Sequence, residues 1–364
     1  MALEPKQVGI KEIARVLKIS IGTVDRALHN RSGVSEKTKS KVLQMASELG
    51  YRPNLAAQAL KLNRRISIAA VLPKHISYFF DPLRAGIAAA ADAAVRGQIA
   101  VDFIEYPRLG AGDEEALQKA IQGGYNGIIV LPGKMQRYSA IMRKLAREGI
   151  ATMCVGSDAP ASERIGSVGV DAYVSGAIAA EILSLRLNQK ANVVVFSGEL
   201  SLMDHAEKLR GFAATIAVQA PHLTLLPALE SHEQPREAYR QTLELMRRRN
   251  RPEGLYLSTA NSQPVLQALD ELNLLDKIHI VTTDLYKDLI PLIEYGKVLA
   301  TIHQRPFTQG KLAFENLVRY LLQDDEIHRY IRLAPHIVLR SNLALFSENA
   351  PASILGTEEE QMHL

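Results

Sequence analysis

The sequence predicts an α/β protein that has a small helical domain at its N-terminus and a large two-lobed body of doubly wound sheets. Two patterns carry this prediction. Apolar residues recur at helical spacing through residues 8–54, and from residue 66 onward short apolar runs alternate with helical ones. The body of roughly 300 residues exceeds the usual size of one hydrophobic core, so we expect two lobes.

Three short amphipathic helices are expected in the N-terminal domain. Their apolar faces comprise Ile10, Ile13, Ala14 and Leu17, then Val24, Ala27 and Leu28, then Val42, Met45, Ala46 and Leu49. Ser20 and Ser35 precede the second and third helices as simple N-caps. Two helices joined by a tight turn, with a third closing the core, is the helix-turn-helix arrangement.

Positive charge is concentrated in the same segment. Residues 1–65 hold 13 Lys or Arg against 5 Asp or Glu, a net charge of +8, whereas residues 66–364 have a net charge of −4. A compact basic domain ahead of a mildly acidic body fits DNA binding, and the alternative is a solvated basic face on a small helical domain. The helical pattern and the charge together favour DNA.

Strands and helices alternate through the body, which predicts parallel sheets covered on both faces. The expected strands are residues 66–72, 101–106, 127–131, 152–155, 167–170, 193–196, 223–228, 254–257, 278–282, 298–303 and 337–345. The expected helices are residues 82–96, 114–122, 135–148, 173–187, 206–218, 236–248, 263–272, 288–295 and 309–322. Asp81 and Pro82 are expected to start the first of these helices, as N-cap and first residue.

Polar residues follow many of the predicted strands, where doubly wound sheets bind their ligands. They are Ser157-Asp158, Asp171, Ser258-Thr259 with Asn261, Asp284 and Gln304. Any one of them is also explained as a helix cap or turn residue. Their clustering at one edge of two lobes predicts a polar cleft.

The order of residues in the N-terminal domain resembles the DNA-binding head of the LacI/GalR family of bacterial transcription regulators. The resemblance rests on Ile13-Ala14, Ser20-Ile21-Gly22-Thr23-Val24, Arg26-Ala27-Leu28, residues 34–38, and Leu49-Gly50-Tyr51-Arg52-Pro53-Asn54. It implies phosphate contacts from Ser20 and Thr23, and base reading from Ile21, Gly22 and Arg26. Residues 55–60 are similar to the family's hinge helix, which implies that Leu60 inserts into the minor groove. Asn30, Asn54 and Ala57 complete the implied DNA-contacting set.

Four features of this head and its hinge bear on its DNA contacts. Gly9 stands where the family usually has a Thr or Ser cap, and Gly22 removes a side chain from the reading face, so the operator of a relative cannot be transferred. Asp25 either accepts from a cytosine amine or pairs with a neighbouring Arg. Residues 54–61 form a short helix or a linker, and eight residues are too few to be stably helical alone.

The body resembles the type I periplasmic sugar-binding fold that this family carries as a sensor, and is most similar to the ribose-binding type. The residues that carry this resemblance are Phe79-Phe80, Gly169-Val170-Asp171, His205 with Arg210-Gly211-Phe212, Thr283-Asp284, and Ala300-Thr301-Ile302 with Gln304-Arg305-Pro306. It implies a sugar or sugar derivative packed on Phe79 and Phe80. The expected effector-binding set is completed by Asp158, Asp171, His205, Lys208, Asn261, Asp284 and Gln304.

Two substitutions weaken the sugar pocket of that type. Ala172 stands where an Asn is frequent, and Ala206 where an Arg commonly clamps the ligand, a role that Lys208 or His205 would have to fill. His205 is equally well explained as a hydrogen-bonded residue at a helix N-terminus.

The resemblance also sets the expected domain limits. They are a DNA-binding domain over 1–52, a hinge over 53–64, and an effector-binding and dimerisation domain over 65–346, followed by a loose tail over 347–364. Within the body we expect one lobe from residues 65–160 and 296–325, and the other from 161–295 and 326–346. The crossings between them are expected near residues 159–164, 286–296 and 324–332.

Enzymatic signatures are absent from the sequence. Residues 127–134 look like a phosphate loop but have five residues between the glycines, and Met135 replaces the magnesium-binding hydroxyl. Cys154 is the single cysteine and the ten histidines lack metal-ligand spacing, so we expect no metal and no cofactor. No signal peptide or apolar run of membrane-spanning length occurs, and a bacterial cytoplasmic location is expected.

These observations predict a transcription regulator, most simply a repressor, that binds operator DNA as a homodimer under control of a small polar effector. The alternatives are an activator or corepressor-type regulator that senses a non-sugar metabolite, a sugar-transport binding protein, and an enzyme fused to a DNA-binding head.

Overall fold

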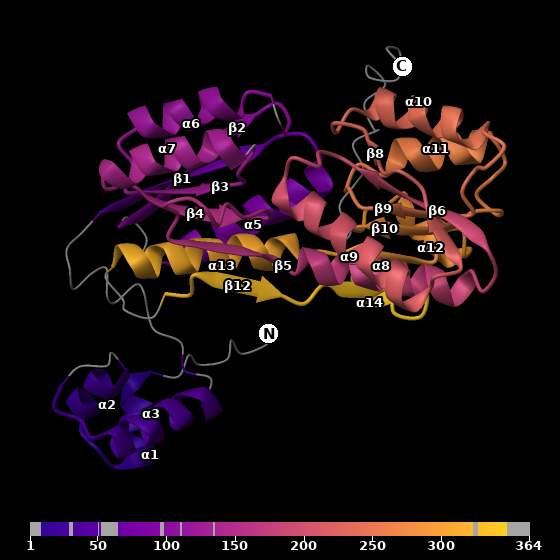
Figure 1. Cartoon of the computed structure of the whole chain (residues 1–364). Coiled ribbons are helices and arrows are strands. Elements are labelled where there is room, and N and C mark those ends of the chain that lie inside the picture. Colours follow the sequence, from indigo (N-terminus) through magenta and orange to yellow (C-terminus); the bar gives the residue numbers. More distant parts are fainter. Residues whose placement is uncertain are drawn as a thin grey trace.

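The computed structural model describes residues 9–28, 32–49, 51, 65–94, 98–109, 111–133, 135–322 and 327–347. These residues form a small helical head and a two-lobed α/β body (Figure 1). Among the residues so described, no helix has the length and apolar character needed to cross a membrane.

The head contains the three expected helices, α1 (Ile10–Leu17), α2 (Ile21–Leu28) and α3 (Glu36–Glu48). Their buried core consists of Ile13, Ala14, Val24, Ala27, Val42 and Ala46. Both predicted caps are confirmed. The Ser20 hydroxyl accepts from the backbone N–H of Thr23 at 3.0 Å, and that of Ser35 accepts from Thr38 at 3.2 Å. Gly9 provides no side-chain cap to α1, as its missing side chain requires.

The first lobe is built on a six-stranded parallel sheet in the order β12-β5-β4-β3-β1-β2. Its strands are β1 (Ile66–Pro73), β2 (Ile99–Tyr106), β3 (Gly127–Val130), β4 (Ala151–Val155), β5 (Gly166–Val170) and β12 (Tyr330–Leu333). Helices α6 (Asp113–Gln122) and α7 (Met135–Arg147) cover one face. Helices α5 (Ser77–Ala93) and α13 (Pro306–Leu321) cover the other.

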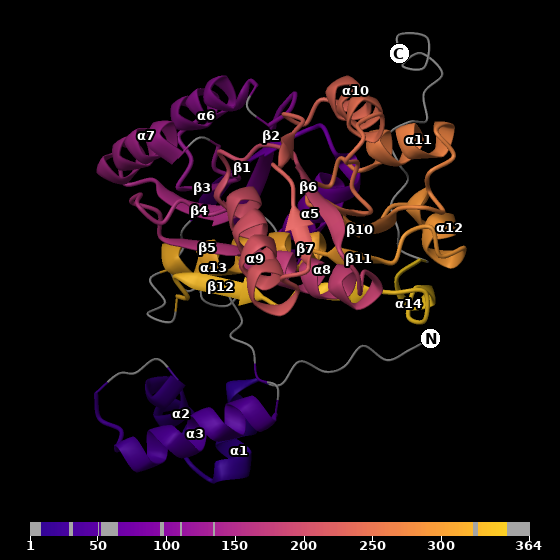
Figure 2. The ribbon, with the colours of Figure 1, turned by 45° about the vertical axis from the view of Figure 1, so that its right-hand side comes forward.

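The second lobe has a seven-stranded sheet in the order β13-β11-β10-β9-β6-β7, with β8 also paired to β6. Its strands are β6 (Ala191–Ser197), β7 (Leu223–Leu225), β8 (Leu229–Glu230), β9 (Gly254–Leu257), β10 (His279–Thr283), β11 (Ala300–His303) and β13 (His336–Val338), of which β13 alone runs antiparallel to its neighbour. One face is covered by α8 (Ala172–Arg186) and α9 (Met203–Gln219), and the other by α10 (Pro235–Met246), α11 (Gln263–Glu271) and α12 (Leu289–Glu294) (Figure 2). A short helix, α14 (Ala344–Ser347), ends the described chain.

The chain crosses between the lobes three times, as expected, but at other places. The crossings follow β5, β11 and β12, so β5 and β12 belong to the first lobe and β11 to the second, the reverse of the predicted assignment. The reason is strand pairing: β5 pairs with β4, β12 pairs with β5, and β11 pairs with β10. Local periodicity identifies a strand but not the sheet that it joins.

Three other predictions about elements were wrong. Strand β12 was missed, because it is an edge strand of only four residues that are exposed or half-buried. The expected strand at 223–228 is two short strands on either side of Pro227, which has no N–H to donate to the ladder. The last expected strand ends at Val338, after which the Asn342 side chain closes a turn by accepting from the Leu339 N–H at 2.7 Å.

Helix α5 starts at Ser77, five residues before the predicted start, so Asp81 is not its N-cap and Pro82 lies inside the helix. Tyr78, Phe79 and Phe80 are buried, and their packing favours helix here over the local preference for a start at proline. Asp81 instead forms an exposed ion pair with Arg84 at 2.5 Å.

Glycines allow helices α8 and α9 to pack closely. A Cβ on Gly176 of α8 would collide with the Lys208 carbonyl oxygen of α9, and one on Gly211 of α9 would collide with the Tyr173 carbonyl oxygen. Only glycine permits this approach. The contact fixes α9, and with it Lys208 and His205, at the edge of the second lobe.

Candidate functional site

Helix α2 presents the predicted DNA-reading face. It buries Val24 and Ala27 and leaves Gly22 and Arg26 exposed, and the Ile21 side chain is 49% exposed although it is apolar. An exposed Arg can take guanine O6 and N7 together, and an exposed aliphatic group can contact a thymine methyl.

The N-terminus of α2, where phosphate contacts are predicted, has two hydroxyl groups that pair with each other. The hydroxyls of Ser20 and Thr23 are hydrogen-bonded to each other at 2.8 Å beside the first-turn N–H groups. These N–H groups and the helix dipole favour an anion. Asp25 is half-buried in the same helix. Four other predicted DNA contacts, Asn30, Asn54, Ala57 and Leu60, lie outside the described residues.

A small cavity lies between the two lobes, and its two walls differ in chemistry. We call it the interlobe cavity; its volume is about 40 Å³. The first lobe supplies a mainly apolar wall, and the second a mainly polar one. The first lobe contributes Ile76, Phe79, Phe80, Leu109, Leu131, Gly156 and Ser157. The second lobe contributes Leu202, Asp204, His205, Lys208, Glu233 and Ala260, and also Gln304, which directly follows β11. Five predicted effector residues, Phe79, Phe80, His205, Lys208 and Gln304, are therefore brought together.

A chain of hydrogen bonds runs through the polar wall. The buried ammonium of Lys208 pairs with Asp204 at 2.6 Å and donates to Gln304 Oε1 at 2.8 Å. Gln304 donates in turn to the Asp284 carboxylate, from Nε2 at 2.7 Å and from its backbone N–H at 2.9 Å. Because a lysine only donates and a carboxylate only accepts, this chain sets the orientation of the Gln304 amide.

Asp284 does not line the cavity itself but accepts hydrogen bonds from Gln304, which does. It is 1% exposed and has a left-handed backbone with φ of 64°, a conformation that Asp tolerates better than most residues. Burial raises its pKa, against the opposing effects of His303, Gln304 and Lys208. The side chain of Asp284 is therefore oriented by its two hydrogen bonds from Gln304 and not by contact with solvent.

Glu233 is a cavity residue that the sequence analysis missed. Its carboxylate accepts from Thr259 Oγ1 at 2.8 and 2.9 Å and lies 3.8 Å from His205 Nε2. Burial raises the pKa of Glu233, and the neighbouring His205 opposes this rise. His205 Nδ1 accepts from the Glu199 N–H at 2.9 Å, so a neutral ring carries its proton on Nε2, toward Glu233.

Asp204, also missed, lies four residues before Lys208 on α9, a spacing that predicts an ion pair. Asn261 was predicted and is buried beside the cavity-lining Ala260, and its Nδ2 is a buried donor without a hydrogen-bond partner. Buried donors usually have a hydrogen-bond partner, so this one stands out beside the cavity.

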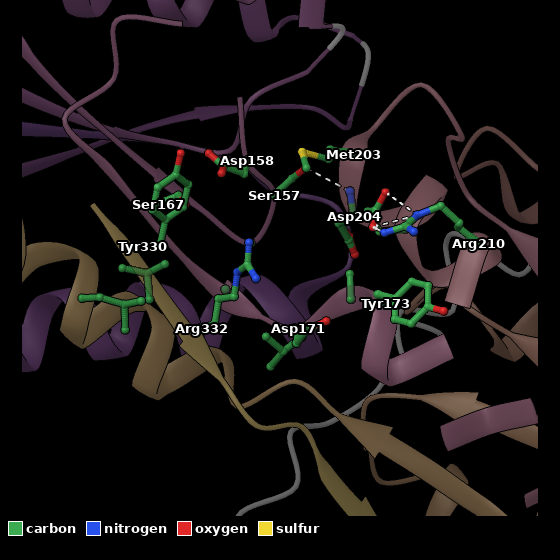
Figure 3. Close-up of a pocket in the computed structure, with 17 residues that line it drawn as sticks. Ser157, Asp158, Ser167, Asp171, Tyr173, Met203, Asp204, Arg210, Tyr330 and Arg332 are labelled. Carbon is green, nitrogen blue, oxygen red and sulfur yellow. Dashed lines mark hydrogen bonds and ion pairs between the residues drawn. The ribbon is translucent and has the colours of Figure 1, made fainter. Parts of the chain in front are cut away.

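The remaining predicted residues, Asp158 and Asp171, line a neighbouring lateral cavity of about 310 Å³ (Figure 3). Asp158 is engaged by Arg164, with Nη2 and Oδ2 2.7 Å apart, and Asp171 caps α8 by accepting from the Val174 N–H at 3.0 Å. Both carboxylates thus have structural partners. The two cavities share Gly156, Ser157 and Asp204.

The two lobes are in direct contact around these cavities. The Tyr78 hydroxyl of α5 donates to the Ala260 carbonyl oxygen, and its ring lies 4.8 Å from that of Tyr286. The Asp204 N–H donates to Ser157 Oγ at 3.4 Å, between the interlobe and lateral cavities.

A helix-turn-helix head followed by two lobes with a cavity between them defines the class of DNA-binding regulators that have a small-molecule sensor domain. Residues 9–54 match the lacI family of bacterial regulatory proteins, and residues 68–325 match the periplasmic binding protein domain family. The chain belongs to the lacI family and carries a periplasmic binding protein domain as its body.

Known regulators match the chain over different lengths. The HTH-type transcriptional regulator RegA of Clostridium acetobutylicum is 42% identical over 77 residues, which cover 21% of this chain and only 23% of RegA. The HTH-type transcriptional repressor PurR of Vibrio parahaemolyticus is 22% identical over 338 residues, covering 92% of this chain and 98% of PurR.

Solved structures of solute-binding proteins share the fold of the body. One from Agrobacterium vitis, bound with α-D-tagatopyranose, has a TM-score of 0.73 at 18% identity and covers 79% of this chain and 100% of its own. The glucose-galactose binding protein GanP from Geobacillus stearothermophilus has a TM-score of 0.70 at 21% identity and covers 77% and 99%.

Proposed function

We propose that this protein is a transcriptional repressor whose affinity for operator DNA is controlled by a small polar effector bound between the lobes. The observation that supports this most is the combination of an exposed recognition face on α2 with an interlobe cavity that has one aromatic and one charged wall. The cavity alone would also fit a transport protein, and the recognition face on α2 favours a regulator.

The cavity walls favour a sugar or sugar derivative as the effector. Phe79 and Phe80 offer ring surfaces to C–H groups, while Glu233 and Gln304 offer acceptors to hydroxyls. Sugars bind two of the solved relatives in fold. The ion pair of Lys208 and Asp204 and the buried carboxyl group of Glu233 also suit a derivative that bears a charged group, which is the second candidate.

The cavity in this conformation is small, so we propose that effector binding changes the separation of the lobes. The contact between Asp204 and Ser157 would part and join the interlobe and lateral cavities. Because β1 starts at Ile66, directly after the predicted hinge, a movement of the first lobe would shift the hinge segments and the Leu60 wedge.

We further propose that the protein acts as a homodimer on a near-palindromic operator, in the bacterial cytoplasm, and without catalytic activity. One helix-turn-helix buries too little DNA surface for tight specific binding, whereas a two-fold dimer reads two half-sites. Turnover of a bound effector would contradict the absence of catalysis.

The test is a titration of the full chain with a panel of pentoses, hexoses and their amino and acid derivatives, followed by operator binding with each ligand that binds. We expect one class of ligand to change operator affinity. Glu233→Gln should weaken that ligand at least tenfold, because it loses charge-assisted hydrogen bonds of about 1.5–3 kcal/mol. Glu181→Gln, on the exposed surface of α8, is the matched control and should bind normally. A ligand whose affinity is equal in both variants would contradict the assigned cavity.

A further inference from the structure

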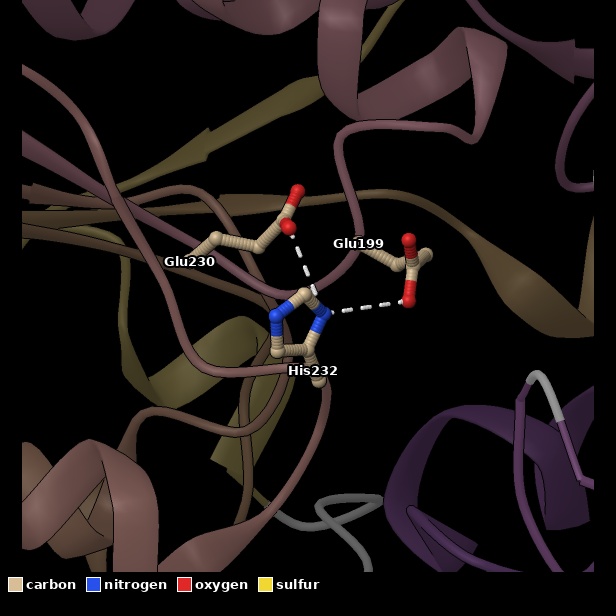
Figure 4. Close-up of side chains that lie close together, drawn as sticks. All are labelled: Glu199, Glu230 and His232. Atoms are coloured by element: carbon tan, nitrogen blue, oxygen red, sulfur yellow. Dashed lines mark hydrogen bonds and ion pairs between the residues drawn. The ribbon is translucent and has the colours of Figure 1, made fainter.

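Three potential metal ligands converge at the carboxyl end of the second-lobe sheet, outside the interlobe cavity (Figure 4). His232 Nδ1 lies 3.2 Å from Glu230 Oε1 and 3.3 Å from Glu199 Oε2. The three ligand atoms all lie within 4.8 Å of one another. The sequence analysis found no metal-ligand spacing, because Glu199 is about thirty residues away along the chain.

Both carboxylates are held by hydrogen bonds that aim one oxygen at the imidazole. Glu230 Oε2 accepts from the Leu200 N–H at 2.5 Å, and Glu199 Oε1 accepts from the Ser201 hydroxyl at 2.7 Å. Each carboxylate therefore uses its other oxygen toward His232. Outer hydrogen bonds of this kind orient metal ligands and are part of most metal sites.

The backbone places these ligands on a rigid edge of the sheet. Strand β8, which ends at Glu230, pairs with Ser197 at the end of β6, and Glu199 follows two residues later. The His232 N–H donates to the Gly198 carbonyl oxygen at 2.7 Å, which ties the loop after β8 to the loop after β6.

We propose that Glu199, Glu230 and His232 bind a divalent transition-metal ion, with Zn²⁺ the best fit. In a tetrahedral site with bonds of about 2.0–2.1 Å, neighbouring ligand atoms are about 3.3–3.4 Å apart, close to the two distances from Nδ1. One imidazole and two carboxylates suit Zn²⁺, whereas Mg²⁺ and Ca²⁺ prefer oxygen alone. The fourth position is left for water or an external ligand.

The proposed metal site and the interlobe cavity are connected by consecutive residues of the backbone. His232 and Glu233 both have φ of 52°, and this pair of left-handed residues turns one side chain outward and the next inward. The His232 side chain is 50% exposed, whereas Glu233 is 1% exposed in the interlobe cavity. Arg108 of the first lobe donates to the His232 carbonyl oxygen at 3.4 Å. A bound metal would add a further constraint on the turn that carries Glu233.

The test uses the full chain without an affinity tag, stripped of metal, and titrated with Zn²⁺ against a chromophoric chelator. We expect the wild-type chain to have a site that is weakened at least tenfold in His232→Asn and in Glu230→Gln. Asn is chosen because it tolerates the left-handed backbone at this position. Glu244→Gln, exposed on α10, is the matched control and should bind like the wild-type chain.

Co²⁺ provides a second readout, since the d–d absorption of a tetrahedral nitrogen and oxygen site should appear in the wild-type chain and be lost in His232→Asn. Circular dichroism of the metal-free variants checks the fold, and Glu199→Gln tests the third ligand independently. Equal Zn²⁺ affinity in the wild-type chain and all three ligand variants would overturn the proposal and leave an imidazolium–carboxylate ion pair. The result does not depend on the proposed effector, because the metal alone is the probe.

Discussion

Asp284→Asn should destabilise the polar wall of the interlobe cavity, because it breaks the order of donors and acceptors there. Lys208 donates to Gln304 Oε1, and Gln304 Nε2 donates to Asp284 Oδ2. An asparagine side chain at position 284 keeps an acceptor for the Gln304 backbone N–H but turns its amide nitrogen toward Gln304 Nε2. Rotating the Gln304 amide would only move the clash of donors to Lys208.

The expected magnitude follows from one buried polar group that loses its partner. Asp284 and Gln304 are 1% and 6% exposed, so bulk water does not reach the lost hydrogen bond. Such a group costs about 1–3 kcal/mol, which corresponds to a fall in Tm of roughly 2–6 °C for a domain of this size. The cavity should also bind the effector more weakly, because the Gln304 amide loses its fixed orientation.

The double variant Asp284→Asn/Gln304→Glu restores the pattern with the carboxylate moved from position 284 to position 304. The carboxylate at position 304 would accept from both Lys208 and the amide nitrogen at position 284. The amide oxygen at position 284 would still accept from the backbone N–H of residue 304. We expect the double variant to regain most of the lost Tm in a thermal melt of the full chain.

Two results would count against this reasoning. If the double variant is as unstable as the sum of Asp284→Asn and Gln304→Glu alone, the Lys208–Gln304–Asp284 chain does not control the wall. A Tm of Asp284→Asn equal to that of the wild-type chain would refute the reasoning directly.

Three further predictions concern DNA binding, pH and assembly. Arg26→Ala should lose about 1–3 kcal/mol of discrimination per half-site while weak non-specific binding remains, as measured by fluorescence anisotropy with operator and random DNA. Burial raises the pKa of Glu233 above its ordinary value of 4.5, so the folded state binds the proton of this carboxyl group more tightly than the unfolded state does. The stability that this proton contributes is lost as the pH rises from 4.5 through the raised pKa. Glu233→Gln should therefore become more stable relative to the wild-type chain over that pH range in thermal melts, and a constant difference would be contrary to this. Sedimentation should find a dimer at micromolar concentration, and a monomer both free and on DNA would rule the dimer out.

Local patterns predicted the head and most body elements because these depend on periodicity and capping. They did not predict the sheet to which β5, β11 and β12 belong, since pairing is decided by contacts distant in sequence. The early start of α5 shows the same limit. Burial of three consecutive aromatic residues against both lobes outweighs the Asp81-Pro82 start signal.

Only part of the candidate site was predicted, again because contacts between residues distant in sequence bring some of its members together. Lys208 and Gln304 follow recognisable motifs, and Asp204 was within reach of an i, i+4 argument. Glu233 and His232 lie in a loop with two successive left-handed residues, and nothing in their local sequence predicts that conformation. Their side chains reach two different sites only because the loop is tied to the end of β6.

The most direct test of the central claim is selection of DNA by the full chain from a random or genomic pool, with and without the effector. The account predicts enrichment of one near-palindromic sequence with two half-sites, a change of its enrichment with effector, and loss of the sequence preference in Arg26→Ala. Retention of DNA without any shared sequence, or an identical preference in Arg26→Ala, would contradict it.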